Sequence, residues 1–372
     1  KTDVVVAAEY YHRNALMAGD REVSADADMR ARGGQNRRDG NVSSLLFAYR
    51  PGDPTWGYFA LAPGKAAGQT VGDYVPFDTN MNTSGQFLNT REWTASIPEQ
   101  ENQSFYGRIN HEIFSEGKLE AYARFLYAQN EYTSSIVTGA TAVTSDVLAT
   151  SPHFPTGFFY YTGLDRPTAY IHPDAIGPRG RKYARDVYDF QFGLKGRVGE
   201  SWSWDATYVY GWWYRDDLQS NSIHIPTLRS AIDSGAYNPF AMDWAAGVNP
   251  NNGLAYDNPA ALRAASASGR IDHDFGVRGG DVRFNGALAQ LPGGKLEIAG
   301  GGDYYRVEQS AVPDAVITTG SAAYSGFNST QFSSSGYTSK GAFAELVVPA
   351  FGGDFQFPLA RSRSFSLNVR RC

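Results

Sequence analysis

Residues 202–214 alternate between apolar and polar side chains. The even positions form an aromatic-rich apolar row: Trp202, Trp204, Ala206, Tyr208, Tyr210, Trp212 and Tyr214. The odd positions are mostly polar, with Val209 and Trp213 as exceptions. Because successive side chains of a β-strand point to opposite faces, the pattern predicts one strand between two different environments. About thirteen residues is long for a strand of a soluble sheet, where five or six is usual.

The same alternation recurs along the chain and predicts about nine strands. We expect them at residues 3–10, 101–113, 119–127, 188–198, 202–214, 281–288, 296–304, 341–348 and 364–370. Their connections fall into two classes. Tight turns are expected near 115–118, 199–201 and 291–294, and a somewhat longer link near 350–361. Long, irregular stretches rich in Gly, Pro, Asn and Ser occupy 14–100, 133–181, 218–272 and 311–336.

Strict alternation of tight turns with long loops is typical of outer-membrane barrels, and compact soluble domains rarely keep such long loops. The sequence therefore predicts an all-β fold, an antiparallel transmembrane β-barrel with short periplasmic turns and long extracellular loops. One alternative is a secreted β-rich protein such as a solenoid, propeller or adhesin, although no repeat of 20–50 residues occurs. Another is a small closed barrel of eight or ten strands, which would need an extra strand at 44–50 or 56–61.

Composition is consistent with this prediction and narrows the class. The 372 residues are 42% hydrophobic and 14% aromatic, with 40 glycines, and the formal charge of −5 does not indicate nucleic-acid binding. Mean hydropathy is −0.39, and no run approaches the roughly twenty apolar residues of a helical membrane span. The one cysteine is Cys372, which excludes disulfides within the chain. Because no secretory signal is visible at Lys1, we expect a mature chain or one that begins partway into its protein.

Several phrases, in their order along the chain, resemble the barrel domain of TonB-dependent receptors of Gram-negative bacteria. They are residues 10–16 with Asp20-Arg21, residues 105–110, Tyr237-Asn238-Pro239-Phe240, residues 299–306, and residues 342–346 with Pro349. The resemblance covers nearly the whole chain, residues 1–372, as a single barrel domain. It implies a 22-stranded barrel, closed by an N-terminal plug, that imports scarce nutrients with energy from the TonB–ExbB–ExbD system.

The chain departs from that family pattern in three respects. No plug-like region precedes the first strand, no TonB-contacting segment is visible, and residues 369–372 lack a terminal aromatic strand. Nine strands would also place the two termini on opposite sides of the membrane, whereas bacterial single-chain barrels have even strand numbers. An unclosed sheet exposes unpaired backbone groups to lipid. We therefore expect a fragment, roughly the N-terminal half of such a barrel, without the plug and the C-terminal strands.

Known catalytic and cofactor motifs are missing from the sequence. There is no Gly-x-Ser-x-Gly elbow, P-loop or dinucleotide fingerprint, and the six histidines show no metal-ligand spacing. Asp272-His273-Asp274 is the densest titratable cluster, but neighbours on a strand face opposite ways and cannot converge. Asn258-Pro259 before Ala260-Ala261-Leu262 predicts a short loop helix. We therefore expect no enzyme activity, no metal and no cofactor.

Two groups of residues are weak candidates for substrate binding. Tyr160 and Tyr161, in the aromatic run 158–161, could stack on a sugar or flat chelate, although loop packing is the favoured interpretation. Arg124, Arg215 and Asp303 are expected to face the lumen, where cross-strand ion pairs of a hydrated lining are the simpler explanation. Trp202, Trp204, Trp212 and Tyr214 are expected to form girdles at the two membrane interfaces.

The functional hypothesis is an outer-membrane transporter in a Gram-negative bacterium. Its partners would be outer-membrane lipid, an extracellular small-molecule ligand, and TonB–ExbB–ExbD through a plug that this chain lacks. The strands do not separate siderophore, glycan, peptide and cobalamin uptake, nor active import from porin-like diffusion. The alternative is a small closed barrel, or a secreted structural or adhesive β-protein, without a transport role.

Overall fold

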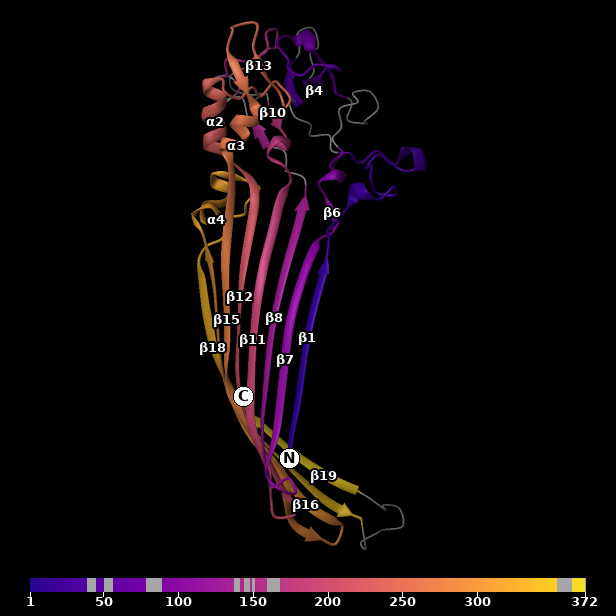
Figure 1. Ribbon diagram of the computed structural model, residues 1–372, viewed down its shortest axis with the longest axis vertical. Coiled ribbons are helices and arrows are strands. Elements are labelled where there is room, and N and C mark those ends of the chain that lie inside the picture. Colours follow the sequence, from indigo (N-terminus) through magenta and orange to yellow (C-terminus); the bar gives the residue numbers. More distant parts are fainter. Residues whose placement is uncertain are drawn as a thin grey trace.

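The protein is mostly β, and its dominant element is an antiparallel sheet of long strands (Figure 1). The computed structural model describes residues 1–38, 45–49, 56–77, 89–136, 141–143, 148, 151–158, 168–352 and 363–371. Nine long strands follow one another across the sheet in chain order, each antiparallel to the next. They are β1 (Thr2–Arg13), β7 (Glu99–Phe114), β8 (Leu119–Ile136), β11 (Arg179–Val198), β12 (Trp202–His224), β15 (Ser266–Leu291), β16 (Gly294–Pro313), β18 (Ser333–Phe351) and β19 (Arg363–Arg371).

The nine predicted strands are confirmed in number and place, but most are longer than expected. β12 runs for 23 residues and β15 for 26. The extra length lies mainly at the ends near the long loops. A short tenth strand, β17 (Tyr324–Ser325), pairs with the end of β12 at Ile223 and His224.

Tight turns join the strands at one end of the sheet, as predicted. β7 and β8 are joined by residues 115–118, β11 and β12 by 199–201, and β15 and β16 by two residues. Glu116, Gly117 and Gly199 have positive φ angles there, a conformation that tight turns demand. The N-terminus lies at this same end (Figure 1).

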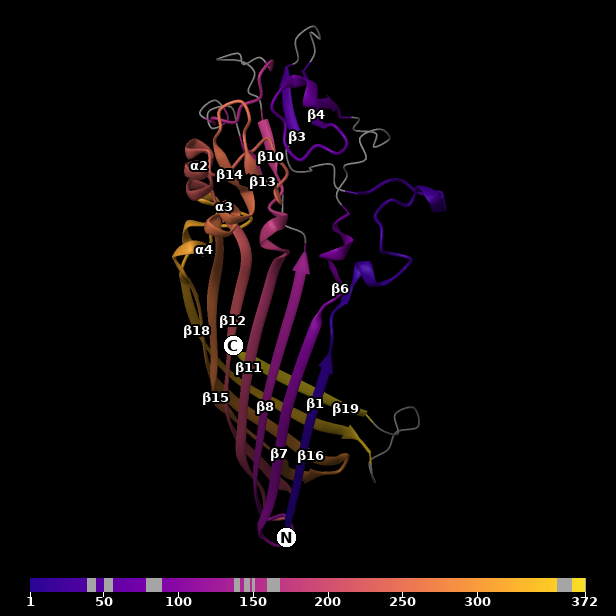
Figure 2. The same cartoon turned by 45° about the horizontal axis from the view of Figure 1, so that its top comes forward.

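The sheet does not close into a barrel within the described residues. β1 pairs with β7 alone and β19 with β18 alone, so both edges are open in the part of the chain described. The sheet is strongly twisted, since β16, β18 and β19 slant across behind β1, β7 and β8 (Figure 2). The fold is thus an open, curved antiparallel sheet, which agrees with an all-β prediction at that coarser level.

The long loops are folded, which corrects the expectation that they are irregular. They carry a five-stranded sheet in the order β5-β4-β3-β10-β9 and a two-stranded hairpin. Its strands are β3 (Leu45–Tyr49), β4 (Trp56–Leu61), β5 (Tyr74–Pro76), β9 (Thr141–Val143) and β10 (Thr168–Ile171), and the hairpin joins β13 (Ala246–Val248) to β14 (Ala255–Asp257). We call these elements, with helices α2 (Ile225–Ser234) and α3 (Asn258–Ala265), the crown.

Smaller elements complete the loop end of the molecule. β2 (Leu16–Met17) pairs with β6 (Ala95–Ile97), and helix α4 (Ala315–Thr319) lies between β16 and β18. Short 3-10 helices are η1 (Ala18–Asp20), η2 (Arg30–Arg32), η3 (Val71–Asp73), η4 (Thr90–Glu92), η5 (Asp174–Ile176) and η6 (Gly320–Ala322). The predicted loop helix is confirmed as α3, although its N-cap is Asp257, whose carboxylate accepts the N–H of Ala260.

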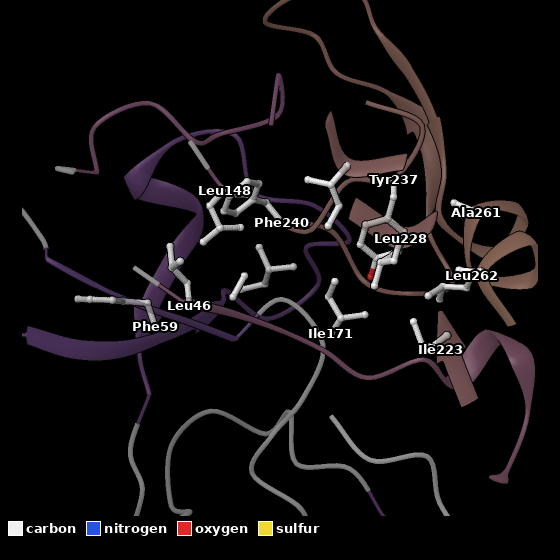
Figure 3. Packing of buried hydrophobic residues seen from close by; sticks show 14 of the residues in the cluster. Leu46, Phe59, Leu148, Ile171, Ile223, Leu228, Tyr237, Phe240, Ala261 and Leu262 are labelled. Atoms are coloured by element: carbon white, nitrogen blue, oxygen red, sulfur yellow. The ribbon is translucent and has the colours of Figure 1, made fainter. Parts of the chain in front are cut away.

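One hydrophobic core holds the crown together (Figure 3). It joins residues from three loops that are distant in sequence, including Leu46, Phe59, Ile171, Tyr237 and Leu262. The segments 44–50 and 56–61, which a small closed barrel would have needed as an extra wall strand, supply β3 and β4 of the crown sheet instead. That alternative therefore loses its candidate strands.

Candidate functional site

The two faces of the large sheet differ in chemistry throughout its length. Directly paired residues share a face, so one register row can be followed from strand to strand across the sheet. Such a row runs through Val4, Ile109, Ala123, Phe192, Tyr208, Gly280, Tyr304 and Lys340. The neighbouring row on the opposite face runs through Asp3, Asn110, Tyr122, Gly193, Thr207, Asp281, Asp303 and Gly341. We call these the apolar face and the polar face.

Large side chains of the apolar face are exposed over most of the sheet. Phe192 is 54% exposed, Val282 52% and Tyr304 49%, although each lies on a long strand that is paired on both sides. Apart from Ala18 and Ala27, the buried hydrophobic residues of the described chain gather in the crown and around α4 instead. The core of this protein is therefore at the loop end, and the sheet presents an uncovered apolar surface.

Aromatic rings line the apolar face in cross-strand contact. Phe125 lies 4.7 Å from Phe190 between ring centroids, and Tyr188 stacks on Trp212 at 5.3 Å with an interplanar angle of 15°. Aromatic pairs of this kind stabilise a sheet by about 0.5–1.5 kcal/mol beyond the area they bury. Trp202 and Trp204 lie at the turn end of β12, with Trp212 and Tyr214 further toward the crown.

The apolar residues form a band that crosses the strands obliquely. On β8 the band extends from Leu119 to Tyr127, centred on Ala123, whose row reaches Lys340 on β18. On β18 the band extends from Ala342 to Val348. Its centre therefore lies about five residues closer to the turns than Lys340, where the row of Ala123 meets β18. This shift accumulates over the five strand-to-strand steps from β8 to β18. At roughly 3.3 Å per residue and 4.8 Å between strands, this drift corresponds to a tilt of about 35°.

The polar face is a lattice of charged and hydroxyl groups that pair across strands. Arg124 Nη2 lies 3.4 Å from the Asp189 carboxylate, and Lys195 Nζ lies 3.0 Å from Glu120. The Tyr122 hydroxyl lies 2.6 Å from Thr207 Oγ1 and within 3.3 Å of the Asp205 carboxylate. These contacts show the cross-strand pairs that the simpler sequence interpretation expects, whereas a hydrated lumen on this side stays a prediction.

A tighter ionic cluster lies on the polar face near the crown. Arg181 donates two hydrogen bonds, of 2.9 and 2.5 Å, to the Asp217 carboxylate, whose side chain is 2% exposed. This bidentate geometry raises the pKa of Arg181. Arg215 Nη2 lies 4.0 Å from the same carboxylate and 2.9 Å from His273 Nε2.

His273 accepts a hydrogen bond from that neighbour. An arginine donates and does not accept, so His273 Nε2 must be the acceptor of the contact with Arg215. Burial and then the positive charge of Arg215 lower the pKa of His273. Asp272 faces the other way, where its carboxylate accepts hydrogen bonds from the Tyr214 hydroxyl and Arg270. The sequence prediction that Asp272, His273 and Asp274 do not converge is therefore confirmed by the register.

The described substrate candidates lie on one face but not at one place. Arg124, Arg215 and Asp303 all belong to the polar face. The register row of Arg124 crosses β12 six residues, about 20 Å, before Arg215. Asp303 is four strands away from β8. Tyr160 and Tyr161 lie outside the described residues. Phe158, from the same aromatic run, is buried against Phe59 and Tyr74 in the crown core.

The crown contains buried polar groups that sequence reasoning missed. The Tyr237 hydroxyl donates a 2.6 Å hydrogen bond to Asp243, and burial raises the pKa of Tyr237 well above its usual value. Asn258 accepts the N–H of Asn238 and donates to the carbonyls of Asn238 and Met242. The Tyr237-Asn238-Pro239-Phe240 phrase was the available signal, because an apolar and amide-rich run in a long loop is unusual for a solvated connection.

Neither a scan against protein-family models nor a search of curated proteins returned a match for this sequence. Among the residues that the structure describes, no helix is long and apolar enough to cross a membrane. In the same residues, no three His, Cys, Asp or Glu side chains are grouped as a metal ion would require.

Proposed function

We propose that this chain is part of the wall and the extracellular crown of an outer-membrane β-barrel receptor of the TonB-dependent type. It would take up a scarce nutrient of the siderophore, glycan, peptide or cobalamin class into a Gram-negative bacterium. The observation that carries the proposal is the uncovered, oblique apolar band on the large sheet.

The size of the band favours lipid as its environment. Soluble monomers rarely expose contiguous apolar patches larger than a few hundred Å², whereas this band crosses nine strands. Burying apolar surface contributes roughly 25 cal/mol per Å², so contact with water would be strongly unfavourable here. The tilt of about 35° implied by the band lies at the lower end of the range that transmembrane barrel strands adopt.

The two ends of the sheet suggest an orientation. Tight turns and the N-terminus lie at one end, and the crown lies at the other (Figure 1). In outer-membrane barrels the short turns are periplasmic and the long loops extracellular. A membrane crossing takes about ten strand residues, so the 23 residues of β12 would hold the crown well above the outer leaflet.

The open edges of the sheet are the reason to propose a larger wall. Unpaired backbone groups cost several kcal/mol each in hydrocarbon, so β1 and β19 would need partner strands in a membrane. Further strands would complete the barrel, and a plug inside it would couple the polar face to TonB–ExbB–ExbD. The crown would capture the ligand, and the hydrated polar face would line its path.

Fractionation and ligand binding test this proposal together. Expressed in a Gram-negative host within the full-length protein, which would supply the partner strands of β1 and β19, the chain should be recovered in the outer-membrane fraction and resist extraction by carbonate. In micelles it should bind one of four probes saturably: a ferric hydroxamate, cyanocobalamin, a malto-oligosaccharide or an oligopeptide. Leu228→Asp, in the crown core, should abolish that binding, whereas Arg229→Asp, exposed on the same helix, should not. Recovery as a soluble protein would overturn the proposal.

A further inference from the structure

One hollow lies on β12, β15, β16 and β18, and a second extends from β8 across β11, β12, β15 and β16 to β18. On the apolar face, the atoms nearest to a Cβ placed on Gly280 or Gly302, in the second hollow, are backbone atoms, so no side chain fills the space there. The upper one, nearer the crown, has a volume of about 760 Å³ and is bordered by Trp212, Gly276 and Arg306. The lower one has a volume of about 860 Å³ and is bordered by Tyr208, Gly280 and Gly302. Four residues along β15 separate Gly276 from Gly280, about 13 Å. We call these two hollows, which follow one another along β15, the groove.

The side on which the upper hollow opens follows from its lining. Gly276 pairs with Trp212 in the register, and a Cβ placed on Gly276 would meet no atom within 4 Å. The space in front of the apolar face is therefore open at this point. The lining of this hollow includes Phe275 and Val277 of the polar-face rows of β15, but not Val209 or Trp213 of β12. Gly276 and Gly336 flank Glu308 in one register row and so leave space beside it.

Cations gather where the two hollows meet. Arg278 and Arg306 are direct cross-strand partners, and both reach Glu308, at 3.8 and 2.5 Å. On the next strand, Lys340 Nζ lies 5.6 Å from the centre of the Tyr304 ring. Like charges directly opposite each other destabilise a sheet, and one carboxylate offsets only part of this cluster. Asp274 borders the upper hollow four residues beyond Arg278, at the crown end.

The height of this cluster matters for its ligand. Arg278, Arg306 and Lys340 each lie two residues above the last member of the apolar band on their own strands, which are Gly280, Tyr304 and Ala342. If the band is in lipid, as the proposed function requires, these cations are at headgroup level. The lower hollow then faces acyl chains, and its lining is mostly apolar and shaped by small residues, with Ala206, Gly280 and Gly302 between larger aromatic side chains.

We infer that this groove, which rests on the proposed function, binds one phosphorylated glycolipid of the outer leaflet. The phosphate would accept charge-assisted hydrogen bonds from Arg278 and Arg306. A sugar ring would lie over Gly276 against the indole of Trp212, and an acyl chain would run down past Gly280 and Gly302. A phosphate rather than a carboxylate fits the pair, since two guanidinium groups can share its oxygens.

Lipid binding in micelles tests the inference. The purified protein is mixed with diphosphoryl lipid A or with its dephosphorylated form, and bound lipid is counted by native mass spectrometry. We expect retention of the diphosphoryl form to fall at least tenfold in the Arg278→Gln/Arg306→Gln variant. Gly276→Trp should cause a similar loss by occupying the upper hollow, which is open at the Cβ position of Gly276. The control is Arg124→Gln/Arg283→Gln, which removes the same charge from the polar face and should retain the lipid.

The outcomes separate this inference from the proposal beneath it. Quenching of Trp fluorescence by brominated lipid in vesicles of the same variants reports membrane insertion independently. Normal insertion with equal binding of both lipid A forms, or with undiminished binding by Gly276→Trp, would overturn the groove and leave the receptor proposal standing. Failure of the wild-type protein to insert would overturn both.

Discussion

Trp212 and Trp213 are neighbours in sequence and belong to two different surfaces. Trp212 stacks on Tyr188 on the apolar face at 5.3 Å, and Trp213 stacks on Phe275 on the polar face at 5.7 Å. Both contacts follow from the register of β12, in which Trp212 pairs with Tyr188 and Trp213 with Phe275. This separation by one residue gives a way to test each face against a matched control.

An arginine introduced on the apolar face should lower the free energy of unfolding more than one introduced on the polar face. Tyr208→Arg places a guanidinium near the middle of the apolar band, and at the midplane of a bilayer such a change costs about 2–4 kcal/mol. Val209→Arg, on the polar face, should lower the free energy of unfolding by less than about 1 kcal/mol. Reversible unfolding in urea from phospholipid vesicles measures both. Equal costs for the two variants would contradict the two-faced sheet.

Cavity formation in the crown should unfold the crown and spare the large sheet. Leu262 is fully buried, so Leu262→Ala should cost about 2–5 kcal/mol, whereas Arg263→Ala on the exposed side of α3 should change little. Limited proteolysis should then cleave residues 225–265 faster in the first variant, with unchanged far-ultraviolet circular dichroism from the sheet. Slow cleavage in both variants would mean that the crown core is not what holds this loop.

The acid sensitivity of the crown should depend on Asp73. Its hydrogen bond with Lys65, aided by the backbone N–H groups of Gln69 and Thr70, lowers the pKa of Asp73 to about 2. A carboxyl with a lowered folded pKa stabilises the fold above its ordinary value, near 4, and loses that contribution as the pH falls toward 2. Hydrogen exchange of residues 69–76, corrected for intrinsic rates, should show this loss. In Asp73→Asn the profile should be flatter, and identical profiles would refute the assignment.

His273 should titrate below an ordinary histidine. Burial and the guanidinium of Arg215 both disfavour its charged form, so its pKa lies below about 6.5. The unfolded chain then binds the extra proton first, and the stability that His273 contributes is present above pH 6.5 and lost as the pH falls below it. Nuclear magnetic resonance of labelled imidazole should show this low pKa, and Arg215→Gln should raise it partway. A titration unaffected by Arg215→Gln would contradict the contact.

The sequence predicted the wall strands well because each has one apolar and one polar face across the band. It underestimated their length, because beyond the band both faces become polar. His12, Glu101 and Asp216, for example, share the apolar face but lie above it. Beyond the band, apolar and polar residues no longer alternate along the sequence. The strand continues there only through the pairing of its backbone.

The crown could not be read in the same way. Its core residues, such as Leu46, Ile171 and Leu262, come from three loops and show no periodicity within any one of them. Their burial depends on contacts between distant segments, which local patterns do not encode. The alternation of odd and even positions was enough to place Arg124, Arg215 and Asp303 on one face of the sheet. Which charged side chains come into contact depends on the register between strands, as the contact between Arg215 and His273 shows.

The central claim is that the apolar face of the large sheet meets lipid and the polar face does not. Two single-tryptophan proteins test it most directly, one carrying Tyr208→Trp and the other Val209→Trp, with all native tryptophans changed to phenylalanine. In vesicles containing brominated phosphatidylcholine, we predict strong quenching for the Tyr208→Trp protein and little for the Val209→Trp protein. Equal quenching of the two, or quenching of the Val209→Trp protein alone, would contradict the account.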